Sequence, residues 1–177
     1  MNVDAKDSGR WLPHGNCYAV VPGRFLAGEY PARGRLGAII KYGVTDFVDL
    51  TSEEDGLVPY AEAARKIARK LGREAGYKRF PIFDGAVPVT DSLTRTILDH
   101  IDGRIDEGGC VYLHCWGGIG RTGTIVGCYL VRHGLDPEEA LDRVESCWRS
   151  MAKYSSSWTS PENELQKDYV RNWGGKE

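Results

Sequence analysis

The ten residues from His114 to Gly123, HCWGGIGRTG, constrain the fold of this 177-residue chain more than any other segment. The apolar stretch 110–113 that precedes them is typical of a buried strand, and the apolar stretch 124–131 that follows is typical of a helix. A glycine-rich turn at a helix N-terminus binds anions, because its N–H groups converge and the helix dipole favours negative charge. The sequence therefore predicts an anion-binding strand–loop–helix unit.

A thiol and a guanidinium flank this loop. Cys115 at a helix N-terminus and close to Arg121 is in a setting that favours the nucleophilic thiolate. Arg121 offers a planar fork that binds two phosphate oxygens and keeps its charge. No Lys-Ser or Lys-Thr pair follows the glycines, so the pattern of a nucleotide-binding P-loop is not met. These residues favour attack on a phosphate over simple retention of one.

The order His-Cys, five residues, then Arg-Thr resembles the active-site signature of the cysteine-dependent protein tyrosine phosphatase superfamily, and the short chain resembles its compact dual-specificity branch. The residues that match the signature are His114, Cys115, Gly118, Gly120, Arg121 and Thr122. The resemblance implies a catalytic cysteine that forms a phosphocysteine intermediate. We expect the hydroxyl of Thr122 to stabilise the thiolate when it leaves, and His114 to orient the loop. The expected phosphate-binding residues are Trp116, Gly117, Gly118, Ile119, Gly120 and Arg121.

Phosphoryl transfer also needs a proton for the leaving oxygen. Asp84 lies in the segment FPIFDGAVP, whose Gly and Pro residues indicate a loop after a strand. Its placement is similar to that of the general-acid loop of dual-specificity phosphatases. An ordinary Asp-Gly turn is the alternative interpretation. Asp91 is the second candidate for the acid, although its position before an apolar-periodic run favours a place at the start of a helix.

Two further segments resemble the same family. The segment RFLAGEYP at 24–31 is similar to a hairpin near the start of compact dual-specificity phosphatases, and SPENELQ at 160–166 is similar to a C-terminal element of some microbial relatives. Gln166 is a candidate for positioning the hydrolytic water, but a surface glutamine on a helix is the interpretation we prefer. Glu29 and Tyr30 are candidates for the substrate mouth, with a solvated Glu and a core Tyr as equal alternatives.

Composition agrees with one catalytic domain over residues 1–177, with residues 1–10 expected to be flexible. Hydrophobic residues make up 41% of the chain, enough for a single core. The net charge of −2 gives no indication of a nucleic-acid or membrane surface, and no apolar stretch approaches the ~20 residues of a membrane helix. Met1 to Gly9 shows no signal peptide, and five cysteines form no CxxC pair. We expect a cytoplasmic monomer that needs no metal or organic cofactor and takes a phosphorylated protein or small phosphorylated molecule as its substrate.

The hydrophobic periodicity alternates between strand and helix. It predicts a single α/β domain with a central, mainly parallel sheet of about four to five strands flanked by about six helices. The expected strands are 17–21, 24–28, 46–50, 77–82 and 110–113. The expected helices are 33–42, 59–71, 93–105, 124–131, one that begins at Pro137 behind an Asp136 cap, and one that begins at 160–162 with Leu165, Tyr169 and Trp173 facing inward.

The substrate is less constrained. None of the variable loop residues Trp116, Gly117 and Ile119 is basic. Phosphatases of multiply phosphorylated inositides tend to have lysines at these positions. We therefore expect phosphotyrosine, phosphoserine or phosphothreonine in proteins. The alternatives are a phosphoinositide or inositol phosphate phosphatase and an RNA 5′-triphosphatase, for which no basic stripe is present. Two alternatives are not phosphatases. A phosphate-reading binding module would lack the Cys, the Arg or the Asp. A rhodanese-like sulfur transferase is disfavoured by the Cys-to-Arg spacing.

Overall fold

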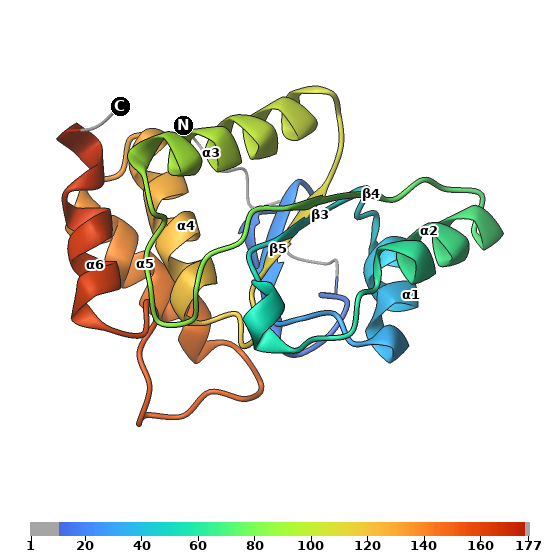
Figure 1. Ribbon diagram of the computed structural model, residues 1–177, viewed down its shortest axis with the longest axis horizontal. Helices are drawn as coiled ribbons and strands as arrows, with labels where there is room; N and C mark the ends of the chain where they lie inside the picture. Colours follow the sequence, from blue (N-terminus) through green and yellow to red (C-terminus); the bar gives the residue numbers. More distant parts are fainter. Residues whose placement is uncertain (1–10, 176–177) are drawn as a thin grey trace.

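A five-stranded mixed sheet forms the centre of the protein, whose computed structural model describes residues 11–175 (Figure 1). The strands are β1 (Cys17–Val21), β2 (Phe25–Gly28), β3 (Asp46–Asp49), β4 (Gly76–Arg79) and β5 (Val111–His114). Their order across the sheet is β1-β2-β5-β3-β4. Only the β1–β2 hairpin is antiparallel, and β2, β5, β3 and β4 pair in parallel. The predicted single α/β domain with a mainly parallel sheet is confirmed.

Helices cover both faces of this sheet, as a parallel sheet requires. The helices are α1 (Arg33–Tyr42), α2 (Ala61–Lys70), α3 (Asp91–Asp106), α4 (Gly120–Arg132), α5 (Pro137–Arg149) and α6 (Glu164–Arg171), with short 3₁₀ turns at Glu53–Asp55 and Trp173–Gly175. In Figure 1, α1 and α2 lie together on one side and α3 to α6 on the other. Two apolar clusters follow this division: α1 and α2 pack over one face of the sheet, and the other four helices pack over the opposite face.

Helix α4 is the central helix of the larger layer. Its residues from Gly120 to Tyr129 are all buried, as expected for a helix that is apolar on nearly every side. It contacts α5 and α6 extensively and also packs on β2 and β5. Gly127 permits the close approach of α6, because a Cβ there would lie 2.8 Å from Cγ2 of Val170.

The parallel strands end at one edge of the sheet and so bring three loops together. Asp49 of β3 is in register with His114 of β5 and with Arg79 of β4. The segments that follow these residues therefore leave the sheet side by side: the glycine-rich loop, the loop with Asp84 and the turn with Asp55. This is the edge at which open α/β sheets bind ligands.

The start of the last helix differs from the prediction. The Ser160–Pro161 peptide bond is cis, and α6 begins three residues later, behind an Asn163 cap whose side chain accepts from the backbone N–H of Gln166. The buried face of α6 also differs from the predicted one. Leu165, predicted to point inward, is 58% exposed, and Val170 is buried instead. Trp173 is fully buried and Tyr169 packs half-buried against the core, as predicted.

The other element boundaries agree with the prediction to within a few residues. The largest differences are at α4, which begins at Gly120 although it was predicted to begin at residue 124, and at β4, which ends at Arg79 although it was predicted to extend to residue 82. Beyond β4, the backbone N–H groups of Phe80 and Ile82 still donate to the carbonyls of Asp49 and Leu50, and both side chains remain buried. The expectation that residues 1–10 are flexible lies outside the described part of the chain.

Candidate active site

A small pocket of about 180 Å³ lies at the C-terminal edge of the sheet. Its lining residues are Asp84, Cys115, Trp116, Gly117, Ile119, Gly120, Arg121 and Glu162. Three of the chemically active residues expected from the sequence, Cys115, Arg121 and Asp84, thus meet in one cavity. Four of the five expected loop residues between the Cys and the Arg also line it.

The loop between β5 and α4 is held by its carbonyl groups, which bond outward to the surrounding protein. The carbonyl of Trp116 accepts from the backbone N–H of Tyr30 at 2.9 Å, and that of Gly117 accepts from Nζ of Lys153 at 2.5 Å. The carbonyl of Ile119 accepts from the hydroxyl of Ser160 at 2.8 Å. A peptide group directs its N–H opposite to its C=O, so these anchors leave the loop amides free to face the pocket.

Gly118 is the position at which this loop depends on glycine. Its φ is +72°, and a Cβ on it would lie 2.3 Å from the carbonyl carbon of Gly28 at the end of β2. Any side chain would therefore meet both backbone strain and a backbone clash. The N–H of Gly118 donates to Sγ of Cys115 at 3.2 Å, which directs an amide dipole at the thiol.

The two other polar side chains of the signature, those of Thr122 and His114, have different surroundings. The hydroxyl of Thr122 is buried and makes no hydrogen bond within the described residues. His114 is fully buried, with Nδ1 2.9 Å from the carbonyl of Cys115 and Nε2 2.5 Å from the hydroxyl of Tyr60. Burial lowers the pKa of His114. A neutral imidazole that donates from Nδ1 and accepts at Nε2 satisfies both contacts, so His114 fixes the orientation of the Cys115 peptide.

Arg121 is 1% exposed and is held by Asp55, a residue that the sequence analysis did not single out. Asp55 binds both terminal nitrogens of Arg121, each at 2.8 Å, and Nη1 also donates to the carbonyl of Ile82. These hydrogen bonds lower the pKa of Asp55. Burial alone would lower the pKa of Arg121, but Asp55 and the nearby Cys115 outweigh it, so the pKa is raised. Nε of Arg121 makes no hydrogen bond in the described part of the chain.

Asp84 reaches the same guanidinium from the solvent side. Its Oδ1 lies 2.9 Å from Nη2 of Arg121, and its side chain is 67% exposed. The loop is tied to α6, because Nδ2 of Asn163 donates to the carbonyl of Gly85 at 2.9 Å. Asp91, the second candidate for the acid, is instead the first residue of α3 and accepts from the hydroxyl of Tyr169, away from the residues that line the pocket.

Glu162 is a pocket residue that the sequence analysis treated only as part of a helix start. Burial raises its pKa, Asp84 adds to the increase and Arg121 opposes it. The preferred interpretation of Gln166 as a surface residue is wrong, since its side chain is fully buried. Gln166 accepts from the N–H of Glu162 and donates to the carbonyl of Ala86. It therefore connects the two segments that carry Glu162 and Asp84.

Glu29 and Tyr30 support the loop from outside the pocket. Glu29 pairs with Arg35 and with Nζ of Lys153, the same amine that holds the Gly117 carbonyl. The hydroxyl of Tyr30 donates to the carbonyl of Val58. Neither residue is among those that line the pocket. Lys153 was missed because it lies far along the chain, in the turn after α5.

Within residues 11–175, no group of three or more His, Cys, Asp or Glu side chains is arranged to hold a metal ion. None of the helices described there has the length and apolar character needed to cross a membrane.

The sequence is similar to a known protein family and to several curated proteins. A family model described as "Swiss Army Knife protein, DSP-PTPase phosphatase domain" matches residues 14–168. The chain belongs to this phosphatase family. Similar curated proteins include protein 067L of Invertebrate iridescent virus 3, a tyrosine phosphatase by name, which is 27% identical over 165 residues covering 88% of this chain and 64% of that protein. The dual specificity protein phosphatase CDC14C of Homo sapiens is 26% identical over 137 residues, 75% of this chain and 30% of that protein. The chain thus spans less than two thirds of the length of each of these relatives.

Solved structures of phosphatases share the fold. The active form of Tk-PTP superposes with a TM-score of 0.72 at 23% identity, covering 92% of this chain and 98% of that chain. PTPMT1 in complex with PI(5)P gives a TM-score of 0.71 at 18% identity, covering 90% and 95%. At these identities the likeness concerns the arrangement of sheet and helices. It agrees with the predicted compact dual-specificity phosphatase fold.

The contacts of Asn163 lead to a prediction that separates a helix cap from a link between loops. Asn163→Ala should lower the free energy of unfolding by roughly 1 kcal/mol, because α6 loses its N-cap. Asn163→Asp keeps the capping oxygen but loses the N–H that binds Gly85, so it should retain most of this stability. Both variants should lower kcat toward an aryl phosphate, because both free the Asp84 loop.

Chemical denaturation and steady-state kinetics measure the two effects. Wild-type kcat in Asn163→Asp would show that the link to Gly85 does not position Asp84.

Proposed function

We propose that this chain hydrolyses phosphate monoesters on protein side chains, through a covalent phosphocysteine formed on Cys115. The observation that carries the proposal is the meeting of Cys115, Arg121 and Asp84 in one pocket of about 180 Å³. In-line displacement at phosphorus needs a nucleophile, a cation and a proton donor. The pocket offers a thiol with an amide N–H directed at it, a buried guanidinium with a free Nε, and an exposed carboxyl.

The reaction proceeds in two steps. The thiolate of Cys115 attacks phosphorus, the S–P bond forms as the bond to the ester oxygen breaks, and Asp84 gives that oxygen its proton. Water then attacks the phosphocysteine, Asp84 takes its proton, and the thiolate leaves with inorganic phosphate as product. Arg121 and the inward-facing amides balance the equatorial charge in both transition states. Asp84 must leave its ion pair with Nη2 as the phosphate takes its place.

The pocket wall favours a singly phosphorylated group on a protein. Arg121 is the only cation among the lining residues, and Asp84 and Glu162 add carboxyl groups that would repel further phosphates. Two large apolar side chains, Trp116 at 57% exposure and Phe83 at 55%, belong to the segments that form the pocket. They suit an aromatic phosphoresidue or apolar neighbours in a peptide. Multiply phosphorylated inositides and RNA 5′-triphosphates are the less favoured substrates.

A substrate panel tests this proposal. The purified chain should give a higher kcat/KM with phosphotyrosyl and phosphothreonyl peptides than with phosphoinositides or 5′-triphosphorylated RNA.

Cys115→Ser should abolish turnover of every substrate while it still binds vanadate, because Arg121 and the loop amides remain. Calorimetry and a phosphate-release assay measure the two properties. Residual turnover near the wild-type level would rule out the covalent mechanism, and tight phosphopeptide binding without wild-type turnover would indicate a binding module.

The second prediction concerns the proton donor. Asp84→Asn should slow hydrolysis of esters with poor leaving groups by ~10²–10⁴-fold, and should affect an ester with a very acidic leaving group much less. Asp91→Asn is the matched control and should leave both rates near wild type. The assignment is wrong if Asp91→Asn produces the dependence on the leaving group and Asp84→Asn does not.

The third prediction follows from the raised pKa of Glu162. Below this pKa the carboxyl is neutral, and as the pH rises through it the ionised group repels the phosphate dianion. KM should therefore increase with pH in the wild type, and Glu162→Gln should reduce that increase. Glu164→Gln, which changes an exposed carboxyl on α6, is the control. Identical KM profiles for wild type and Glu162→Gln between mildly acidic and alkaline pH would contradict a role for this charge.

A further inference from the structure

A second and larger cavity lies at the opposite edge of the sheet, with a volume of about 570 Å³. Its floor contains Thr45, Gly76 and Gly109, which stand at or just before the starts of β3, β4 and β5. The catalytic loop leaves the other end of β5. Gly109 and Cys115 are six residues apart along a nearly extended segment, on the order of 20 Å. This cavity is therefore separate from the catalytic pocket.

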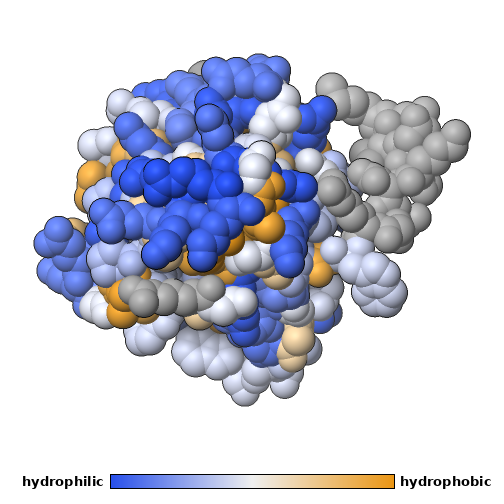
Figure 2. Space-filling view, turned by 90° about the vertical axis from the view of Figure 1, so that its right-hand side faces the viewer, coloured by the Kyte–Doolittle hydropathy of each residue, from blue (hydrophilic) through white to orange (hydrophobic). Residues whose placement is uncertain are grey.

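Arginines dominate the charged wall of this cavity. Arg65 and Arg69 project from α2, Arg73 follows that helix, and Arg104 comes from α3. Figure 2 views the side of the molecule that carries α2, where strongly hydrophilic residues gather. The floor has no large side chain, because glycine and alanine occupy residues 75, 76, 108 and 109. The result is an open hollow with guanidinium groups along its wall.

These arginines differ in how their charge is balanced. Arg104 pairs with Asp46 at 2.9 Å and with Glu107. Arg73 donates one N–H to the carbonyl of Ile40 at 2.7 Å. Arg65 and Arg69 take part in no ion pair or hydrogen bond found within residues 11–175, although they stand one helical turn apart, where like charges repel. Glu74 is the one lining carboxylate left to oppose them in the described structure.

We propose that this cavity is a binding site for a small, soluble organic molecule that carries two or more phosphate groups. Its volume lies in the range of sites for small organic ligands. Guanidinium groups bind phosphate oxygens in pairs, and several of them along one wall can each engage a separate phosphate of the same molecule. Inorganic phosphate, with a single group, uses only part of this wall. The ligand would compensate the repulsion between Arg65 and Arg69.

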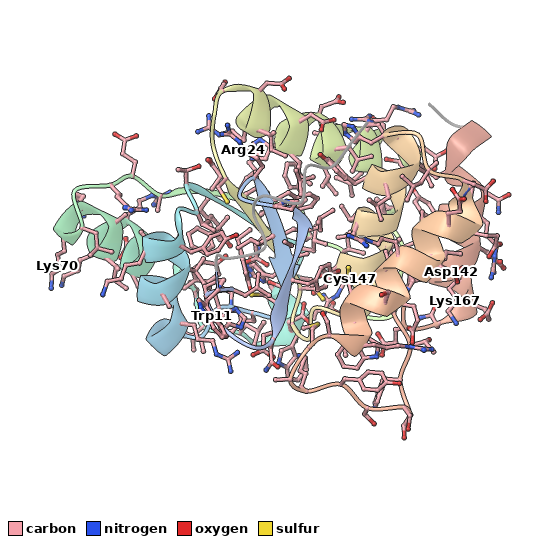
Figure 3. All side chains as sticks on the ribbon, turned by 180° about the vertical axis from the view of Figure 1, so that it is seen from behind. Trp11, Arg24, Lys70, Asp142, Cys147 and Lys167 are labelled. Atoms are coloured by element: carbon pink, nitrogen blue, oxygen red, sulfur yellow. The ribbon has the colours of Figure 1, made fainter. Side chains whose placement is uncertain are left out.

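The same helix supplies a matched control. Lys66 and Lys70 are also exposed, are also one turn apart, and do not line the cavity. Lys70 lies at the outer end of α2 (Figure 3). Removing these two charges lowers the general positive potential of α2 by the same amount as removing Arg65 and Arg69. The comparison therefore separates a built site from diffuse attraction of anions.

Calorimetric titration with inositol hexakisphosphate, with ATP and with inorganic phosphate tests the proposal, with saturating vanadate present to occupy the catalytic loop. The wild type should bind the first two with a stoichiometry of one and inorganic phosphate more weakly. Arg65→Gln/Arg69→Gln should weaken both polyphosphates by roughly tenfold or more, whereas Lys66→Gln/Lys70→Gln should stay within roughly twofold.

Turnover of an aryl phosphate should be unchanged in both double variants, which confirms that they fold. No binding by the wild type, loss of binding on addition of vanadate, or equal weakening in the two double variants would each overturn the proposal. The result is independent of the reaction proposed for Cys115, since it is a measurement of binding at the opposite edge of the sheet.

Discussion

The outward bonding of the catalytic-loop carbonyls is the constraint on which the rest of the site depends. Each anchor comes from a different part of the chain: the backbone of Tyr30 after β2, the amine of Lys153 after α5, and the hydroxyl of Ser160 before α6. With the carbonyls committed to these partners, the amides can face a bound anion without a change of backbone conformation. Such preorganisation is what makes fixed dipoles effective in stabilising a transition state.

The second requirement is a buried cation, and the hydrogen-bonding groups of this cation are only partly used within the protein. Asp55 binds the two terminal nitrogens of Arg121 but leaves Nε without a hydrogen bond in the described structure. A buried guanidinium with no carboxylate would be strongly destabilising, and one satisfied at every N–H would have nothing to offer a phosphate. Asp84 provides a replaceable partner at Nη2, since it is largely exposed. In the reaction that we propose, the same carboxyl then lies near the leaving oxygen.

Local sequence signals were sufficient for the elements and for the residues of the loop. Periodicity located β5 and α4, and the positions of Cys115 and Arg121 at the two ends of a glycine-rich turn brought them into one pocket. The last helix differs: Ser160, Pro161 and Glu162 have the residue pattern of a helix start, but Pro161 follows a cis peptide bond and the helix begins at Glu164. Tertiary packing decides which face of this helix is buried: Leu165 is exposed, whereas Gln166 and Val170 lie in the core.

The sequence by itself determined the strand–loop–helix unit and the chemistry that its thiol, guanidinium and glycines allow, because these properties depend on residues that are adjacent in the chain. Only the tertiary structure decided which partners complete the site. Asp55 lies 66 residues from Arg121, and Lys153 lies 36 residues from Gly117. Glu162 lines the same pocket from the segment before α6. No local pattern encodes contacts over such separations. Their contacts exist because parallel strands end at one edge of the sheet and because α5 and α6 pack against α4, which brings their connecting turns over the loop.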